Sequence, residues 1–246
     1  MGKKSSRGKE KKQSVKAETE KLRQERQAVL DLLNKANAAP DLMAAYPAFR
    51  RYDRNGLAAA LVSCGVGGLP PGDAPWAFAL CKANMQALYD TAWGWDDASK
   101  RDELAATEAR FIVVYTQAQE GGERQPAAYV HYRWEEEDGR PVLYCYEIQL
   151  EPRVQRRGLG GFLMKLLELA ARKVGVDALM LTVIDANVGA RAMYTKLGYL
   201  EHESSPTEEE AAGYGILARR LTAYAAAAAP LRPVTNSYQL EQLIFS

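Results

Sequence analysis

A glycine-rich turn is the segment of this sequence whose residue types most clearly suit the binding of a ligand. Gly158, Gly160 and Gly161 stand at the start of a helix predicted over 162–173, directly after a strand predicted over 141–151. Glycines at a helix start leave backbone N–H groups open to an anion, and the helix dipole adds positive charge at that end. The turn is therefore a candidate anion site.

The composition of this turn fits a pyrophosphate group. Arg156 and Arg157 precede the glycines and add two positive charges, and Leu159 lies between the glycines. A nucleotide P-loop would need Gly-Lys-Ser/Thr at its end, and a dinucleotide fingerprint would need a glycine where Leu163 stands. These two nucleotide-binding classes are excluded.

Glu147 is the residue best suited to act as a general base. It lies in the middle of an apolar and aromatic strand, and two-residue alternation predicts that it shares a face with Cys145 and Gln149. Tyr144 and Tyr146 are expected on the opposite face. A buried carboxylate can take a proton near neutral pH. The alternative, an exposed glutamate on an edge strand, agrees less well with the apolar character of the strand.

The charge of the chain divides into a basic arm and an acidic body. The 246 residues carry a net charge of +1, but residues 1–16 hold seven Lys or Arg against one Glu, which leaves −5 on the rest. An acidic body suits a basic partner better than nucleic acid, so no sequence-specific nucleic-acid binding is expected. The arm is typical of a nuclear-targeting signal, with a nucleic-acid or chromatin contact as the alternative, and we expect the protein in nucleus and cytoplasm. Met1-Gly2 with Ser6 also fits the N-myristoylation pattern.

Neither a metal centre nor a membrane span is expected. Cys64, Cys81 and Cys145 lack metal-ligand spacing, their odd number argues against a disulfide framework, and His131 and His202 cannot build a zinc site alone. No apolar run approaches the ~18 residues of a membrane span. No sustained heptad marks an interface, so we expect a monomer.

Hydrophobic patterning predicts one α/β (α+β) domain that positions the glycine turn and Glu147. We expect a basic flexible tail at 1–16, a domain over 17–220 that begins with a helical extension, and an alanine-rich tail at 221–246. Strands are predicted over 109–116, 127–134, 141–151, 178–184, 199–201 and 214–220. Helices are predicted from near Ser14, from Asp73 to Tyr89, and over 99–106, 162–173 and 188–197. The segment 65–72 is predicted to be a plain loop.

Two separated motifs resemble the Gcn5-related N-acetyltransferase (GNAT) superfamily. Gln155-x-x-Gly158-x-Gly160 is similar to its coenzyme A loop, and the strand ALMLTVI followed by Asn187 and Leu197-Gly198-Tyr199 has the order of its downstream part. The resemblance implies a mixed, mostly antiparallel sheet flanked by helices, with an N-terminal helical extension. It also implies acetyl-coenzyme A as co-substrate and no metal.

Longer stretches resemble a histone-specific group of N-terminal acetyltransferases within that superfamily, over about residues 1–220. They are MGKKSSRGKEKKQ, YDRNGL (52–57), NMQALYDTAWGW (84–95), LYCYEIQLE (143–151), RRGLG (156–160), MLTV (180–183) and SSP (204–206). The resemblance implies acetyl transfer to the N-terminal serine of histone tails that start Ser-Gly-Arg-Gly, those of histone four and histone two A. The alternatives are an acetyltransferase of lysine side chains or small amines, and a module that binds histone tails or acyl-coenzyme A without turnover.

The resemblance also implies residue roles, with Glu147 as the base. The residues implied to hold the co-substrate are Ile148, Gln149 and Leu150, through backbone N–H groups, with Arg156, Arg157, Gly158, Leu159, Gly160, Gly161 and Asn187. The residues implied to bind the peptide are Tyr89, Trp93, Glu135, Tyr146, Thr182, Ser205 and Tyr214.

Several of these residues also have plain structural interpretations. Tyr89 continues a helical seam that is typical of core packing, and Asn187 is suited to cap the helix after it. Glu135 belongs to an acidic run, Glu135-Glu136-Glu137-Asp138, that could simply be a solvated hairpin tip. Tyr194 is interpreted as a packing residue.

Overall fold

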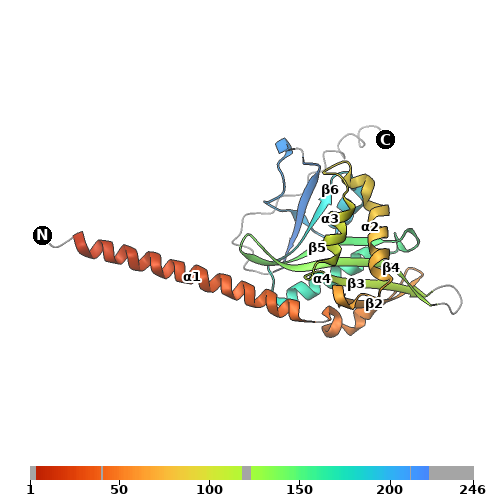
Figure 1. Cartoon of the computed structure of the whole chain (residues 1–246), viewed down its shortest axis with the longest axis horizontal. Coiled ribbons are helices and arrows are strands. Elements are labelled where there is room, and N and C mark those ends of the chain that lie inside the picture. Colours follow the sequence, from red (N-terminus) through yellow and green to blue (C-terminus); the bar gives the residue numbers. More distant parts are fainter. Residues whose placement is uncertain (1–3, 40, 118–122, 211, 222–246) are drawn as a thin grey trace.

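One eight-stranded sheet forms the centre of the protein in the computed structural model, which describes residues 4–39, 41–117, 123–210 and 212–221 (Figure 1). The strand order is β1-β2-β3-β4-β5-β6-β8-β7, and all neighbours are antiparallel except the parallel pair β5 and β6. The prediction of a mixed, mostly antiparallel sheet flanked by helices is confirmed. The strands are β1 (Arg51–Arg54), β2 (Leu57–Gly65), β3 (Arg110–Gln117), β4 (Arg124–Glu137), β5 (Arg140–Leu150), β6 (Ala178–Ile184), β7 (Leu200–Glu201) and β8 (Tyr214–Arg220).

Helices cover both faces of the sheet (Figure 1). On one face the buried side of α4 packs on Ile112 and Leu143, and on the other α2 and α3 pack on Phe111 and Tyr129. The α-helices are α1 (Lys4–Ala38), α2 (Asp73–Tyr89), α3 (Asp97–Ala105), α4 (Leu159–Val174) and α5 (Val188–Lys196). Short 3-10 helices are η1 (Leu42–Ala45), η2 (Pro47–Arg50), η3 (Val66–Gly68), η4 (Pro152–Val154) and η5 (Glu208–Glu210).

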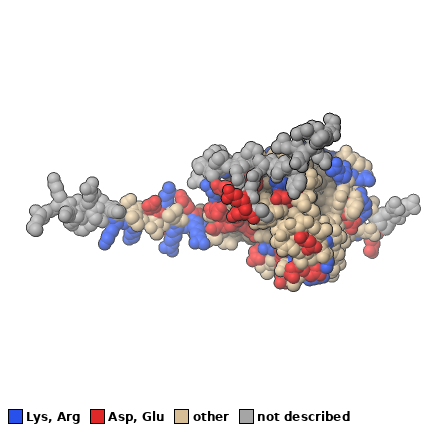
Figure 2. Space-filling model, turned by 90° about the horizontal axis from the view of Figure 1, so that it is seen from above, with Lys and Arg blue, Asp and Glu red and all other residues tan. Residues whose placement is uncertain are grey.

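Helix α1 projects from the body of the protein (Figure 1). It begins at Lys4, well before the predicted start near Ser14. Near its end Leu33 and Ala36 are buried in the core, but Leu22 is 61% exposed, so the extension packs against the body only through its last turns. Figure 2 shows Lys and Arg side chains spaced along the projecting part and acidic side chains gathered on the body.

A β-hairpin precedes α2 that the sequence analysis did not predict. β1 and β2 are joined by Asn55 and Gly56, which both have positive φ angles of 53° and 69°. This Asn-Gly pair is the preferred sequence for a two-residue hairpin turn, since both central residues need positive φ.

Among the described residues no helix is long and apolar enough to cross a bilayer, and no group of three His, Cys, Asp or Glu is placed to hold a metal.

Candidate acyl-transfer site

A β-bulge in β5 sets the direction of Glu147. Along β4 and β5, His131 pairs with Glu147 but Tyr132 pairs with Cys145, so Tyr146 is an extra residue in β5. A bulge of this kind interrupts the alternation of side chains. Cys145 consequently faces α4, whereas Glu147 faces α2 and α3. The expectation that these two side chains share a face is wrong, because strict alternation cannot include the bulge.

Glu147 is buried, as its apolar strand predicts, and its carboxylate accepts hydrogen bonds from three elements. The side chain is only 4% exposed. Its Oε1 accepts hydrogen bonds from the hydroxyl of Tyr89 on α2 (3.0 Å) and from Nζ of Lys100 on α3 (2.8 Å). Its Oε2 accepts one from Nε2 of Gln149 (2.7 Å), which shares its face on β5. The carboxylate is thus held in one orientation.

Lys100 and Glu103 complete a buried charge cluster that the sequence analysis missed. Nζ of Lys100 lies 2.9 Å from Oε1 of Glu103, one helical turn along α3, and 3.0 Å from the hydroxyl of Tyr89. Burial lowers the pKa of Lys100, but the carboxylates of Glu147 and Glu103 outweigh it and hold that pKa above its usual value. Lys100 is therefore a cation in this site.

His131 forms the floor of the site as a neutral ring. It is completely buried and stacks between Phe111 (centroids 5.2 Å apart) and Tyr146 (5.0 Å). Burial, with Arg133 and Lys100 nearby, lowers the pKa of His131 to about 3. Nε of Arg133 donates to its Nε2 (3.3 Å), so the ring proton sits on Nδ1, which has no hydrogen-bond partner.

A row of aromatic rings leads from Glu147 to the surface. Tyr89 lies 5.0 Å from Trp93, and Trp93 lies 5.2 Å from Tyr214 on β8, measured between ring centroids. Trp93 is 50% exposed although it is a large apolar residue. The structure therefore brings together three of the predicted peptide-binding residues, and Tyr89 combines its expected core packing with a direct bond to Glu147.

Tyrosines on β5 form the opposite wall of the site. The rings of Tyr144 and Tyr146 lie 5.3 Å apart. Tyr146 donates to Oε1 of Glu135 on β4 (2.8 Å), and the hydroxyl of Tyr144 lies 2.6 Å from Oγ1 of the exposed Thr182 on β6. Glu135 is therefore part of this wall rather than only a residue of a solvated hairpin.

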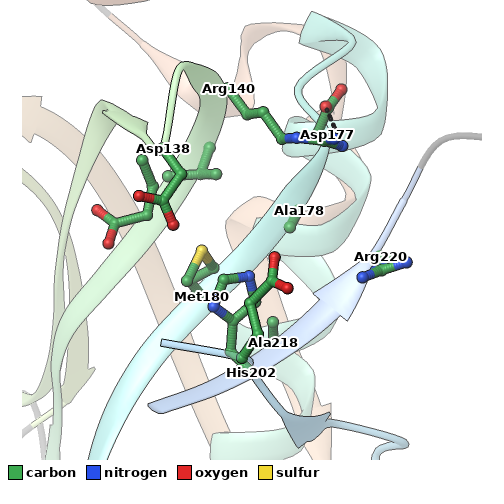
Figure 3. Close-up of a pocket in the computed structure, with 11 residues that line it drawn as sticks. Asp138, Arg140, Asp177, Ala178, Met180, His202, Ala218 and Arg220 are labelled. Carbon is green, nitrogen blue, oxygen red and sulfur yellow. Dashed lines mark ion pairs between the residues drawn. The ribbon is translucent and has the colours of Figure 1, made fainter. Parts of the chain in front are cut away.

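A hollow continues from this wall along the sheet (Figure 3). Its floor is made of small and apolar residues, Ala178 and Met180 on β6 and Ala218 on β8. The hollow is also lined by polar and charged residues, Glu137, Asp138, Arg140, Asp177, His202, Glu203 and Arg220. Acidic side chains thus extend from Glu135 toward the far end of the hairpin between β4 and β5.

Ser205 is engaged in bonds within the protein. It is 5% exposed, its hydroxyl donates to Oε1 of Glu201 (3.0 Å) and it accepts from the backbone N–H of Ile216 (2.9 Å). These bonds tie the segment before β8 to the sheet, and they give Ser205 a role in shaping the loop.

β5 and β6 separate next to Glu147. Their parallel pairing covers only 142–145 on β5 and 178–181 on β6, while β4 stays paired with β5 as far as Leu150. The β6 side of β5 is therefore open over 146–150. Of the predicted stretch, the backbone N–H groups of Ile148 and Leu150 point to this opening, where hydrogen-bond donors could hold a carbonyl oxygen or an oxyanion, whereas that of Gln149 points to β4, as does the N–H of Glu151, which donates to Ala127 (2.8 Å).

The glycine turn at the start of α4 is built as an anion site requires. Gly158 caps the helix with a φ of 83°, and a Cβ there would stand 3.1 Å from the hydroxyl oxygen of Tyr52. A Cβ on Gly160 would stand 3.1 Å from Sδ of Met193. The turn leaves the N–H groups of 158–161 at the positive end of a sixteen-residue helix. These residues fit a pyrophosphate group.

Two arginines of this turn differ in what they contact. Arg157 donates from Nη1 to the carbonyl of Gly56 (2.9 Å), and the carbonyl of Arg157 accepts from Nδ2 of Asn55 (2.8 Å) and from Tyr52. Arg157 therefore fastens the turn to the β1–β2 hairpin. Arg156 is exposed and has a φ of 58°.

Asn187 and Tyr194 have structural roles in α5. Oδ1 of Asn187 accepts from the N–H of Ala190 (3.2 Å), which is the expected cap of this helix and leaves its amide group free to donate. Tyr194 is buried with its ring centroid 5.7 Å from that of Tyr199, in agreement with packing.

Comparison with known proteins gives the class. The acetyltransferase (GNAT) family model matches residues 79–199, which run from α2 through the bulged strand and the glycine turn to the end of α5. The chain has the GNAT fold, and this matched segment, just under half of the chain, is similar to the GNAT acetyltransferases, a class of transferases.

Solved structures of similar fold include several acetyltransferases. The GNAT domain of S. lividans PAT is 18% identical, with a TM-score of 0.50, and the match covers 72% of this chain and 99% of that one. The ribosomal-protein-S18-alanine N-acetyltransferase from Escherichia coli is 22% identical (TM-score 0.43, 66% and 94% covered). NAA60 of Arabidopsis thaliana, solved with a bisubstrate analogue, is 10% identical (TM-score 0.48, 66% and 100% covered).

Proposed function

We propose that this protein is an N-terminal acetyltransferase of the N-alpha-acetyltransferase D type. It transfers an acetyl group from acetyl-coenzyme A to the α-amine of the serine in histone tails that start Ser-Gly-Arg-Gly. The observation that carries the proposal is a buried carboxylate, Glu147, fixed between an aromatic row and the opening between β5 and β6.

The proposed reaction needs one proton acceptor and one oxyanion site. Glu147 takes a proton from the substrate ammonium, and the freed amine attacks the thioester carbonyl. The new C–N bond forms and the C–S bond breaks. The nitrogen loses its remaining surplus proton to the departing thiolate, so the products are the amide and the coenzyme A thiol. N–H groups at the β5–β6 opening stabilise the charge that develops on the carbonyl oxygen.

An α-amine suits a site with a single carboxylate base. At pH 7.4 roughly a quarter of free α-amines are already neutral, whereas for lysine side chains the fraction is about one in a thousand. Deprotonation of an α-amine is therefore a modest task, which a carboxylate can perform directly or through a water.

The walls of the site fit a basic peptide. Trp93, Tyr214 and Tyr144 supply aromatic faces, and the acidic side chains that begin at Glu135 continue around the adjoining hollow. Aromatic faces and carboxylates both attract arginine and ammonium groups. A tail with a positive N-terminus and an arginine at its third position matches this chemistry.

The test is release of coenzyme A with matched peptides. We expect turnover of a Ser-Gly-Arg-Gly peptide and none of the same peptide with an acetylated N-terminus, even when it contains lysine. Equal turnover of the blocked peptide would show a lysine acetyltransferase. Binding of acetyl-coenzyme A and peptide without turnover would show a binding module.

A further inference from the structure

The contacts of Lys100 are made to Glu147 and its neighbours, which indicates a role in positioning the base rather than in stabilising the fold. We infer that Lys100 is the positioning residue of Glu147, which it keeps ionised and orients toward the incoming amine. Its Nζ touches Oε1 of Glu147 at 2.8 Å and the hydroxyl of Tyr89 at 3.0 Å, and its side chain is 7% exposed. This inference rests on the proposed role of Glu147 as the base.

The cost of burying a lysine argues that its charge is needed. Removal of an ammonium group from water is expensive, and an apolar side chain of similar volume would pack at α3 with less penalty. Two carboxylates, Glu147 and Glu103, converge on this position. Without the cation between them they would repel each other, and a buried carboxylate would then favour its protonated form.

The groups around Lys100 leave the cluster with one surplus negative charge. Tyr89 and Cys81 on α2 stay protonated, because burial and the charge of Glu147 raise the pKa of each. His131 on β4 is neutral, and the charge of Arg133 beside it is balanced by Glu135, whose Oε1 lies 4.0 Å from Nη1 of Arg133. The two carboxylates and the one ammonium carry a net charge of −1. This charge attracts a cationic amine, but because Lys100 neutralises part of the negative charge, the amine is not held in a strong ion pair.

The same contacts distinguish the two oxygens of Glu147. Oε1 accepts from both Tyr89 and Lys100, whereas Oε2 accepts from Gln149. A carboxylate oxygen has two lone-pair directions, so Oε1 is saturated by these bonds. Oε2 is the less engaged oxygen and is the one that takes the proton.

The experiment compares pH profiles of kcat/KM for Lys100→Met, Lys100→Arg and a matched control. Loss of the cation favours the protonated carboxyl of Glu147. In Lys100→Met the acidic limb of the profile, where kcat/KM falls as the pH is lowered, therefore shifts to higher pH by about one to three units, and activity recovers at higher pH. At pH 7 kcat/KM falls at least about tenfold. Lys100→Arg keeps the charge and restores the wild-type limb.

Lys82→Met is the matched control, because Lys82 also joins α2 to α3. Its Nζ lies 2.8 Å from Oδ1 of Asp97, but this pair is largely exposed and does not reach Glu147. We expect the acidic limb of the pH profile of Lys82→Met to coincide with that of the wild type. Thermal unfolding and acetyl-coenzyme A binding check that each variant is folded. If Lys100→Met does not fold, Lys100→Met with Glu103→Gln removes both charges and is expected to show the same displaced limb.

An acidic limb that stays in place in a folded Lys100→Met variant, or that moves equally in Lys82→Met, would overturn the inference. Failure of the proposed substrate is a separate outcome. If the wild type acetylates another amine and no N-terminal peptide, the same profiles are measured with that amine and still test Lys100.

Discussion

The carboxylate of Glu147 is held by three donors, and the nearest charge to it is Lys100. A glutamine at position 147 has almost the same shape but cannot take a proton. We expect Glu147→Gln to lower kcat by about a hundredfold to ten-thousandfold, the usual contribution of general-base catalysis, with binding of acetyl-coenzyme A retained. Stopped-flow or steady-state turnover with a Ser-Gly-Arg-Gly peptide, beside calorimetric titration of acetyl-coenzyme A, measures both quantities.

Glu136→Gln is the control for that substitution. Glu136 lies on β4, the strand that forms a hairpin with the β5 strand of Glu147, but its side chain is only half-buried. We expect its substitution to leave kcat unchanged. Unaltered turnover in Glu147→Gln would remove Glu147 from the role of base.

At the scale of single residues, sequence patterns predicted the burial of Glu147 but not its partners. The apolar strand around Glu147 predicts its burial, and that much needs no tertiary information. Lys100 and Glu103 look like ordinary surface charges of a short polar helix, because nothing in the local sequence shows which side of α3 faces the sheet. His131 is a single ring in an apolar strand, and its neutrality depends on neighbours from β3 and β5.

At the scale of elements, the glycine turn at the start of α4 allows the most specific prediction. Gly158 has a left-handed φ of 83°, and an added Cβ would press against the hydroxyl of Tyr52 at 3.1 Å. Alanine would be strained there and would displace the turn from the β1–β2 hairpin. We expect Gly158→Ala to weaken acetyl-coenzyme A binding at least about tenfold and to lower the free energy of unfolding by about 1 kcal/mol or more.

Gly67→Ala provides the comparison, because a Cβ on Gly67 would meet no atom within 4 Å. Calorimetric titration and urea unfolding of both variants separate the turn from a general effect of losing a glycine. Equal effects in the two variants would contradict the role given to the turn.

Most elements near the site could be placed from the sequence, and the failures have physical causes. Apolar patterning located β3 to β6, α2, α4 and α5, because these strands are runs of residues buried on both faces of the sheet and these helices have one face in the core. The β1–β2 hairpin was missed although Asn55-Gly56 is a strong turn signal, since its strands do not alternate cleanly. The bulge at Tyr146 leaves no mark in the sequence, because it depends on pairing with β4.

At the scale of the whole molecule, the sequence divides its charge between a basic N-terminal arm, residues 1–16, and an acidic remainder. If the arm directs the protein to the nucleus, replacement of the seven Lys and Arg of residues 1–16 by Gln should move it to the cytoplasm. Peptide turnover in vitro should remain within about twofold, since the contacts described for the site come from residues 52–216.

Fluorescence microscopy of tagged chains, beside the coenzyme A release assay on the purified variant, measures both effects. A variant that stays in the nucleus, or one that loses turnover, would contradict this division of roles.

The projecting helix α1 also separates its N-terminal end from the body of the protein. α1 contains 35 residues, which corresponds to about 50 Å along its axis, and only its last turns are anchored in the core. A fusion tag or surface coupling attached at the start of α1 is therefore far from the acyl-transfer centre, and it should leave that centre accessible. Immobilisation through the N-terminus is the natural geometry for single-molecule or surface-based assays of this protein.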